Sequence, residues 1–525
     1  MTRFARLAVR LIRRGFLIML ILVPGLSAIV VVQYRYTFAD PADILSLDGL
    51  AQNPAIRVLF GVPVALDNAG GFTVWRTGTF AAVGLASWAF LTATRITRGE
   101  EQSGRWALLL TGRLRLPLVV AHHLVVLLGA QLVVGAALAL ALIVAGAGVQ
   151  GALIYALGFT LIGMLFAAVG TLCAQLVEER RTASGIAAAV LGSALLLRMV
   201  ADGVERLAWL SWLTPFGLLA EAEPYAANRF GPLAVMVLMV SAVAGLALFA
   251  AAHRDVGSGL ITGSGIRSGR FRLLRSVPGF AIRRMLPSAF GWAAGLCAYF
   301  LIIGLLARSL IEFLIANPRF ADLAAQAGFA GLATVQGYVA ALFALLAIPL
   351  GVFAASRLSH DAADEADGRL AVMFARPLPR SRWAIVQITV ITATVVGLAI
   401  AAGVATATGT ALAGATLPLT EALAGALNVV PAAVLCLGAA QVAIGWVPQA
   451  VLALGAVPAV GGFLVTVLVD TFNWPNWLAQ LSPFTHLAPV PATAPNWAGA
   501  AGMIGVSVLL AGLGIAGFAR RDLRG

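Results

Sequence analysis

The chain has 525 residues, of which 61% are hydrophobic and only 11% are charged. Soluble domains usually carry about 25% charged residues, so this composition excludes a water-soluble globule and predicts an integral membrane protein. Cys173, Cys297 and Cys436 stand singly in apolar stretches without metal-ligand spacing. We therefore expect neither a disulfide framework nor a metal site.

The net charge of +13 comes entirely from arginines, because the chain contains no lysine. A phosphate-binding loop of the form G-x-x-x-x-G-K-[ST] needs its lysine to reach the β and γ phosphates. The chain therefore lacks a conventional nucleotide-hydrolysis motor. We expect it to carry no catalytic residues and to be no enzyme by itself.

Apolar runs of about 20 residues, the length that a helix needs to cross a bilayer, recur along the whole chain. They predict an all-α polytopic membrane protein of about twelve transmembrane helices, because a β-barrel would show short alternating segments instead. The expected helices lie near 15–34, 75–94, 117–146, 150–177, 183–200, 231–251, 289–307, 337–355, 383–408, 421–446, 450–471 and 498–518.

The first apolar run, from Phe16 to Val32, is longer than a signal-peptide core of about 7–15 residues, so we expect it to remain as an anchor. The segments Arg3 to Arg14 and Phe271 to Met285 each mix arginines with apolar residues. Each predicts an amphipathic helix that lies in the membrane interface before its half of the chain begins.

The arginines fall on one side of the predicted spans, which the positive-inside rule makes cytoplasmic. Both termini are then cytoplasmic, and the chain lies in the cell membrane as a multi-pass protein. The basic excess thus reports orientation and indicates no nucleic-acid partner. The opposite loops hold most of the acids: Asp40, Asp43, Asp48, Asp67, Asp202, Glu205, Glu221 and Glu223.

Sequence similarity within the chain relates its two halves. R-G-E-E-Q-S-G-R-W-A, from Arg98, aligns with A-A-D-E-A-D-G-R-L-A, from Ala362, at an offset of 264. The offset drifts only to 268 along the rest of the chain. The matched residues are Glu101, Gly104 and Arg105 with Glu365, Gly368 and Arg369; Gln175 with Gln441; Pro215 and Phe216 with Pro483 and Phe484; and Arg254 with Arg521.

Two six-helix repeats in one orientation follow, since an even number of spans returns the chain to its starting side. We expect a first transmembrane domain at 1–252, a cytoplasmic basic linker with the second interfacial helix at 253–284, and a second transmembrane domain at 285–525. The glycines of the linker do not fit G-x-G-x-x-G, and no strand precedes them. They predict a flexible connection.

The cytoplasmic segments after the second and eighth helices are the sharpest functional candidates. Each predicts a short helix parallel to the membrane with an exposed acid at its start, able to dock into another protein. The alternative is an ordinary positive-inside loop. Duplication of Glu, Gly and Arg in both halves favours the docking helix.

The motifs E-x-x-G-x-x-x-x-L-L after the second helix, [ST]-P-F before the last helix of each half, and R-[RD]-[DV] at its end resemble permeases of type-2 ATP-binding-cassette exporters. The double-length form is similar to actinobacterial exporters of polyketide antibiotics, the tetronasin type. The second half departs from the pattern, because Gln441 is followed by Val442 to Trp446 and lacks the cluster Glu178 to Arg181.

The resemblance implies a permease subunit for hydrophobic or amphiphilic, drug-like compounds. A separate ATP-binding-cassette ATPase in two copies would hold ATP and Mg, and this chain would hold no cofactor. Glu101, Gly104, Arg105, Glu365, Gly368 and Arg369 would then couple to the ATPase, and Pro215, Phe216, Pro483 and Phe484 would close the outer gate. Membrane lipid and a hydrophobic small-molecule substrate are the other expected partners.

A secondary transporter of the twelve-helix facilitator class is the alternative, because it also has two parallel six-helix repeats. That class carries G-x-x-x-D-[RK]-x-G-[RK]-[RK] after its second helix, where this chain has Gly99-Glu100-Glu101-Gln102-Ser103-Gly104-Arg105. A third class, a membrane scaffold or an intramembrane enzyme, lacks support, since neither H-E-x-x-H nor G-x-S-x-G is present.

Overall fold

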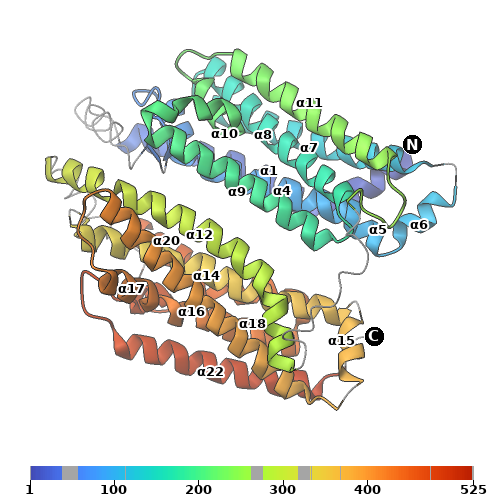
Figure 1. Cartoon of the computed structure of the whole chain (residues 1–525). Helices are drawn as coiled ribbons and strands as arrows, with labels where there is room; N and C mark the ends of the chain where they lie inside the picture. Colours follow the sequence, from blue (N-terminus) through green and yellow to red (C-terminus); the bar gives the residue numbers. More distant parts are fainter. Residues whose placement is uncertain are drawn as a thin grey trace. The chain divides into compact units, whose positions relative to one another are not determined.

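The regular structure of the described residues is entirely helical, without a strand, as the sequence predicts. The computed structural model describes the residues 2–37, 57–58, 60–112, 114–261, 276–316, 331–332, 334–366, 368–375, 377–472 and 475–522. Asp40, Asp43, Asp48 and the linker segment 262–275 lie outside this set. The chain divides into two compact units, Met1–Ser268 (unit 1) and Gly269–Gly525 (unit 2) (Figure 1).

Unit 1 contains six long helices and several short ones. The long helices are α1 (Thr2–Thr37), α4 (Ala69–Thr94), α7 (Leu116–Val144), α8 (Val149–Leu176), α9 (Arg180–Gly203) and α11 (Gly231–Ala252). The short elements are the π-helical η1 (Arg95–Gly99), α5 (Glu100–Gln102), α6 (Arg105–Leu110), the 3-10 helix η2 (Glu205–Leu213) and α10 (Pro215–Glu221).

Unit 2 repeats this order of elements with more breaks. The long helices are α12 (Val277–Ala316), α14 (Val335–Ala366), α16 (Arg380–Leu412), α18 (Val430–Trp446) and α22 (Trp497–Arg520). The shorter elements are α15 (Arg369–Phe374), α17 (Leu419–Asn428), η3 (Pro448–Ala450), α19 (Val451–Ala456), the π-helical η4 (Val457–Gly461), α20 (Gly462–Phe472), α21 (Asn476–Ala479) and η5 (Pro483–His486).

Twelve helical stretches among the described residues are long and apolar enough to cross a membrane, which confirms the predicted number. Six lie in each unit, so the chain is a multi-pass membrane protein. The stretches are Leu7–Arg35, Ala69–Gln102, Leu116–Val144, Val149–Leu176, Arg180–Gly203, Gly231–Ala252, Val277–Ala316, Val335–Ala366, Arg380–Leu412, Leu419–Trp446, Pro448–Thr466 and Trp497–Arg520.

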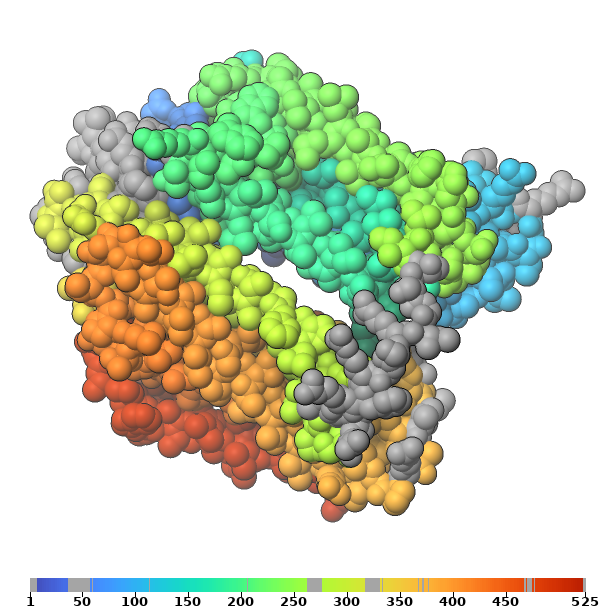
Figure 2. All heavy atoms as spheres, in the orientation of Figure 1, coloured from blue at the N-terminus to red at the C-terminus, as the bar shows by residue number. Residues whose placement is uncertain are grey.

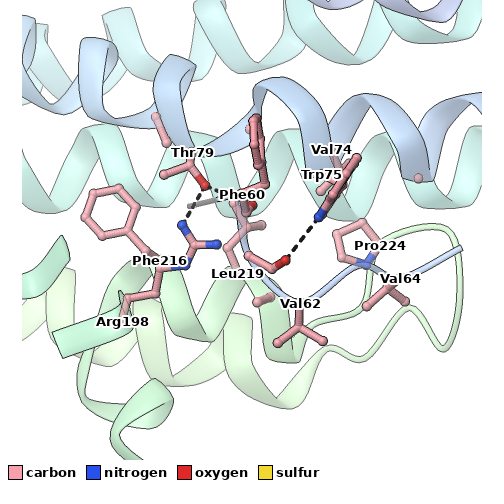
Figure 3. Close-up of a pocket in the computed structure, with 15 residues that line it drawn as sticks. Phe60, Val62, Val64, Val74, Trp75, Thr79, Arg198, Phe216, Leu219 and Pro224 are labelled. Atoms are coloured by element: carbon pink, nitrogen blue, oxygen red, sulfur yellow. Dashed lines mark hydrogen bonds between the residues drawn. The ribbon is translucent and has the colours of Figure 1, made fainter. Parts of the chain in front are cut away.

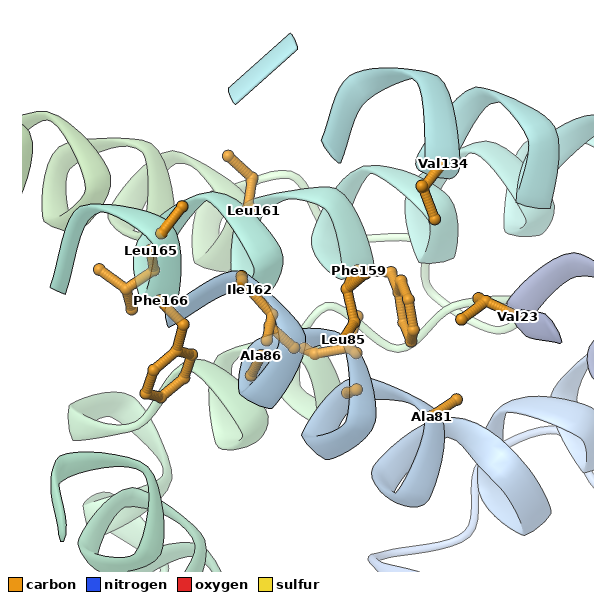
Figure 4. Close-up of a cluster of buried hydrophobic side chains, with 14 of the residues drawn as sticks. Val23, Ala81, Leu85, Ala86, Val134, Phe159, Leu161, Ile162, Leu165 and Phe166 are labelled. Carbon is orange, nitrogen blue, oxygen red and sulfur yellow. The ribbon is translucent and has the colours of Figure 1, made fainter. Parts of the chain in front are cut away.

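The core of unit 1 is built around α8, which packs against α4, α7 and α11. Phe159 and Phe166 of α8 lie in one buried cluster with Leu85 of α4 (Figure 4). Gly170 allows the close approach of α4, because a Cβ added there would lie 2.7 Å from the Cα of Phe90. Small residues at such contacts are the usual means by which membrane helices pack.

Unit 2 differs from the prediction at its fourth span, where one helix was expected over 421–446. The helix breaks at Val429 between α17 and α18, and Pro431 stands at the start of α18. The Asn428 side chain at the break donates to the carbonyl of Ala488 at 2.9 Å. The Asn428 amide, a polar group within a membrane span, thus has a hydrogen-bond partner in the backbone near the break.

The segments predicted as interfacial helices are continuous with the spans that follow. α1 runs from Thr2 to Thr37 without a break, and α12 runs through Pro287. Since both segments have a helical apolar pattern, the helix continues from the basic part into the apolar part. Residues 271–275 of the second segment lie outside the described set.

Candidate functional site

The two matched glycines have the same backbone conformation and the same role. Gly104 has φ of 75° and Gly368 has φ of 71°, and a helix of six residues follows each, α6 and α15. No atom lies within 4 Å of a Cβ added at either position. Glycine is therefore favoured here by the left-handed backbone and not by lack of space. The chain changes direction at these glycines, so the short helix does not continue along the axis of the preceding span.

Glu101 is buried in an ion-pair cluster at the end of α4 and α5. Arg254, after the last helix of unit 1, donates from Nη1 to Oε1 and from Nη2 to Oε2 of Glu101, both at 2.7 Å. Arg98 Nη1 lies 3.1 Å from Glu101 Oε2, and the Gly257 amide donates to Oε1 at 2.8 Å. Gln175 Oε1 accepts from Arg254 Nε at 2.9 Å and from Nη2 at 2.8 Å.

The second arginine of the cluster is held by backbone carbonyls. Arg98 Nε donates to the carbonyl of Ala174 at 2.8 Å, and Arg98 Nη2 donates to that of Ser258 at 2.9 Å. Two guanidinium groups thus share one carboxylate, and carbonyl dipoles offset part of the remaining charge. The ends of α4 and α8 and the segment after α11 are fixed to one another.

The expectation that Glu101 is an exposed docking acid is wrong. Its side chain is only 2% exposed, because three segments that are distant in the sequence meet around it. The same correction applies to Glu365, whose side chain is 3% exposed and lies 2.7 Å from Arg521 Nη2. Both acids hold the base of the short helices. A partner protein could instead contact the short helix that follows each glutamate, α6 or α15.

In unit 2 the matched Glu365 and Arg521 form the equivalent ion pair, and Gln441 is the third matched position. Arg521 makes fewer hydrogen bonds with described residues than Arg254 does. Arg521 Nη2 donates to Glu365 and, at 3.3 Å, to the carbonyl of Ile444. Arg521 Nε and Nη1 and Gln441 Oε1 are buried without a hydrogen-bond partner there. The equivalent three atoms of Arg254 and Gln175 are all bonded in unit 1.

Unit 2 adds a second group of charges beside this cluster. Arg284 of α12 lies 3.6 Å from Asp361 and is also hydrogen-bonded to Asp364. Arg369, at the start of α15, lies 3.5 Å from the other oxygen of Asp364. Unit 1 has Thr97 and Glu100 at the positions that match these two aspartates. The halves therefore share a framework but differ in charge.

Apolar side chains anchor the short helices to the bundle: Trp106 and Leu370 are buried, and Leu109, Leu110, Met373 and Phe374 are partly buried beside them. Trp106 of α6 is 1% exposed and packs against Leu116, Val119, Val120 and Ala251. Its ring centroid lies 5.5 Å from that of His123. Leu370, 264 residues later, is buried with Trp383, Ala384 and Phe518. α6 and α15 are thus packed secondary structure with a buried face.

The other face of α6 is exposed, and Arg105 Nε lies 3.3 Å from Glu100 Oε2. The Arg105 side chain is 62% exposed and Leu108 is 76% exposed. In Figure 2 the light-blue atoms around α6 project at the end of unit 1. An exposed leucine beside an exposed arginine offers an apolar contact and a positive charge to another protein. In unit 2 the Arg369 side chain is 56% exposed.

The residues expected at the outer gate lie at the starts of two short helices. Pro215 begins α10, where the Thr214 hydroxyl accepts from the amide of Gly217 at 2.9 Å. Phe216 is buried and its ring centroid lies 6.2 Å from that of Phe166. The repeated threonine or serine before proline is thus a helix cap in unit 1.

The same arrangement occurs in unit 2 at the start of η5. Ser482 accepts from the amide of Phe484 at 3.2 Å, and Pro483 begins the helix and is buried. The ring of Phe484 lies 5.7 Å from that of Phe463 of α20. The [ST]-P-F motif therefore caps the start of a short helix in both halves.

No group of three or more His, Cys, Asp and Glu residues that could hold a metal occurs within the described ranges.

This architecture is that of a polytopic membrane protein made of two similar six-helix halves. Residues 274–519 match the protein family described as multidrug efflux system permease Rv1217c, C-terminal domain. The chain is also 28% identical over 480 residues to the multidrug efflux system permease protein Rv1217c of Mycobacterium tuberculosis (strain ATCC 25618 / H37Rv). The aligned region covers 90% of this chain and 85% of that relative. The chain is therefore a homologue of a multidrug efflux permease.

Proposed function

We propose that this chain is the membrane-spanning subunit of an ATP-driven exporter of hydrophobic or amphiphilic compounds. A separate ATP-binding-cassette ATPase, in two copies, would supply the energy with ATP and Mg. The observation that carries the proposal is the duplicated short helix, α6 and α15, which follows a left-handed glycine and a buried Glu–Arg pair in both halves. The absence of lysine from the chain agrees with a motor on another polypeptide.

Within this proposal the coupling residues have different tasks. Glu101 and Glu365 fix the base of the short helices, and Gly104 and Gly368 set their direction. Arg105, with Leu108, is the part of unit 1 that would contact the ATPase. A push on α6 would reach the ends of α4, α8 and α11 together, because the Glu101 cluster joins them.

The relative's name supports the substrate class of this proposal, since that protein is a permease of a multidrug efflux system. The short helices at Pro215 and Pro483 would close the outer end of each half. Both are capped and packed against long helices, so a movement of those helices would carry them along. These positions are the proposed outer gate, together with Phe216 and Phe484.

The test is a paired measurement of ATPase capture and substrate efflux. The double variant Arg105→Glu and Leu108→Asp reverses the charge and removes the apolar contact on the exposed face of α6. We expect it to express and fold normally, because surface changes usually cost under ~0.5 kcal/mol, but to capture less ATPase and to lose efflux. Arg206→Glu, an exposed arginine of η2 at the opposite end of unit 1, is the matched control and should change neither.

Two results would contradict the proposal. Normal capture and efflux by the double variant would remove α6 from the contact. ATP hydrolysis by the purified chain alone would show a motor in this polypeptide and overturn the assignment of energy supply to a partner.

A further inference from the structure

Unit 1 has a cavity at the end opposite α6, the end that the arginine distribution assigns to the outside. It has a volume of about 50 Å³ and lies between α4, α9, α10 and the chain before α4 (Figure 3). A water molecule needs about 10–15 Å³ of such space, so the cavity holds about four water-sized groups. Its large apolar walls are Phe60, Val62, Val64, Val74, Trp75, Phe216, Leu219 and Pro224.

One charged side chain enters this apolar cavity. Arg198 of α9 lines it and is only 4% exposed. Its Nε lies 2.7 Å from Asp202, and its Nη1 donates to the Thr79 hydroxyl at 2.6 Å. Its Nη2 has no hydrogen bond to any part of the chain that the structure describes, and it packs against Gly61, where an added Cβ would lie 1.9 Å away.

The charge balance around Arg198 decides what the cavity can accept. Two arginines, Arg198 and Arg57, and two acids, Asp202 and Glu221, interact here, so their charges balance and the site offers no uncompensated charge to an added ion. A neutral oxygen can still accept a hydrogen bond from Nη2, which has no hydrogen-bond acceptor within the described part of the chain. An ion-paired arginine inside a span also marks a functional site more often than a structural one.

The arginine of this pair belongs to one half only, whereas Asp470 stands 268 residues after Asp202. Thr466 stands 268 residues after Arg198, and its hydroxyl donates to Ser482 at 2.9 Å and to the carbonyl of Gly462 at 3.1 Å. The residue at the matched position in unit 2 therefore makes hydrogen bonds to the helix-capping Ser482 and to a helix carbonyl. A structural need shared by both halves does not explain the arginine.

We propose that the cavity of unit 1 binds an uncharged amphiphilic compound by one small apolar group that carries a carbonyl or ether oxygen. The apolar group lies against Trp75, Phe216 and Leu219, and the oxygen accepts a hydrogen bond from Arg198 Nη2. Reading the ligand as a transported compound rests on the proposed function. The ester carbonyl of a membrane lipid is also an uncharged hydrogen-bond acceptor, so a membrane lipid is the other candidate ligand of the cavity.

The test uses two probes of nearly equal shape that differ in the small group able to enter the cavity: 4-fluoroacetophenone, which has a carbonyl acceptor, and 4-fluoro-α-methylstyrene, an arene in which a methylene group replaces the oxygen. Fluorine NMR titrations of the full chain in maltoside micelles report their affinities. We expect the ketone to bind about tenfold or more tighter, because a hydrogen bond from a charged donor is worth about that factor.

Two variants test separately how the apolar walls and the hydrogen-bond donor Arg198 contribute to binding. Val62→Trp fills the cavity from its half-exposed rim and should abolish binding of both probes, whereas Val237→Trp on the exposed face of α11 should change neither. The double variant Arg198→Met and Asp202→Leu removes donor and counter-ion together, which avoids a lone buried charge. It should reduce ketone affinity to that of the arene and leave the arene unchanged.

The proposal is overturned if the natural chain binds both probes equally, or if Val62→Trp leaves ketone binding intact. Repeating the titration in diacyl phosphatidylcholine nanodiscs separates the two sources. Retained ketone selectivity excludes a lipid ester as the occupant and leaves a transported compound, whereas selectivity lost only in nanodiscs shows that a lipid ester occupies the cavity. The titrations contain no ATPase, so their outcome does not depend on ATPase capture. Failure of the proposed function and failure of the proposed binding site can therefore be distinguished.

Discussion

Arg254 holds Glu101 through two parallel hydrogen bonds of 2.7 Å across 153 residues of sequence. Bidentate arginine–carboxylate pairs of this kind are among the strongest polar contacts in proteins. This pair connects the coupling region after the second span to the end of the sixth. It explains why the glutamate and the arginine recur together in both halves.

Glu101→Arg should destabilise the chain strongly. It would place a third positive charge beside Arg98 and Arg254 in a buried site, and breaking a buried pair typically costs about 3–5 kcal/mol. We expect a lower apparent unfolding temperature in detergent and less folded protein by fluorescence-detected size exclusion. Arg105→Glu, four residues away but exposed, should leave both measurements unchanged. Equal stability of the two variants would show that Glu101 is not held as described.

Arg254→Lys and Arg521→Lys should have unequal effects. Arg254 bonds through Nε, Nη1 and Nη2, whereas Arg521 uses only Nη2 within the described contacts. A lysine reproduces one contact but not a bidentate pair. We expect Arg254→Lys to cost about 2–4 kcal/mol and Arg521→Lys to cost about 1 kcal/mol or less. Thermal unfolding of both variants in the same detergent measures the difference, and equal losses would contradict it.

Gly104→Ala should lower stability by about 1–2 kcal/mol, because an L-residue with a Cβ is strained at a φ of 75°. Gly104→Asn should recover part of the loss, since asparagine tolerates the left-handed region. Gly84→Ala, within α4 and also without a neighbour to its Cβ, is the control and should be neutral or slightly stabilising. Hydrogen exchange of the α6 amides would report the change locally.

Cysteines at Ser103 and Ala227 should react with impermeant thiol reagents from opposite sides of the membrane. Ser103 precedes Gly104 at the end assigned to the cytoplasm, and Ala227 is exposed in the loop that contains Glu223. In intact cells Ala227→Cys should be labelled and Ser103→Cys should not, until the membrane is permeabilised. Labelling of Ser103→Cys alone would invert the topology.

Hydropathy was sufficient to predict the twelve spans, because each had to be apolar over its whole length to be stable in lipid. It did not predict the break at Val429, since Asn428 and Pro431 are individually compatible with a continuous membrane helix. The break depends on the Ala488 carbonyl, which lies 60 residues further on. Such a contact is not visible in a hydropathy profile.

The sequence repeat matched Glu101, Gln175 and Arg254 with Glu365, Gln441 and Arg521, but the exposure expected for the two glutamates was wrong. Nothing in the spacing shows that the glutamate and the arginine of each half meet. A glutamate and an arginine that recur together at opposite ends of a repeat are the signal that could have indicated an ion pair. Arg198 was missed because it was not duplicated.

Each half contains its own Glu–Arg closure, formed by residues of that half alone. A gene split within the connecting segment 262–275 would therefore encode two polypeptides that each retain both members of their pair. Arg198 would remain with only one of these two polypeptides, because Thr466 stands at the matched position of the other.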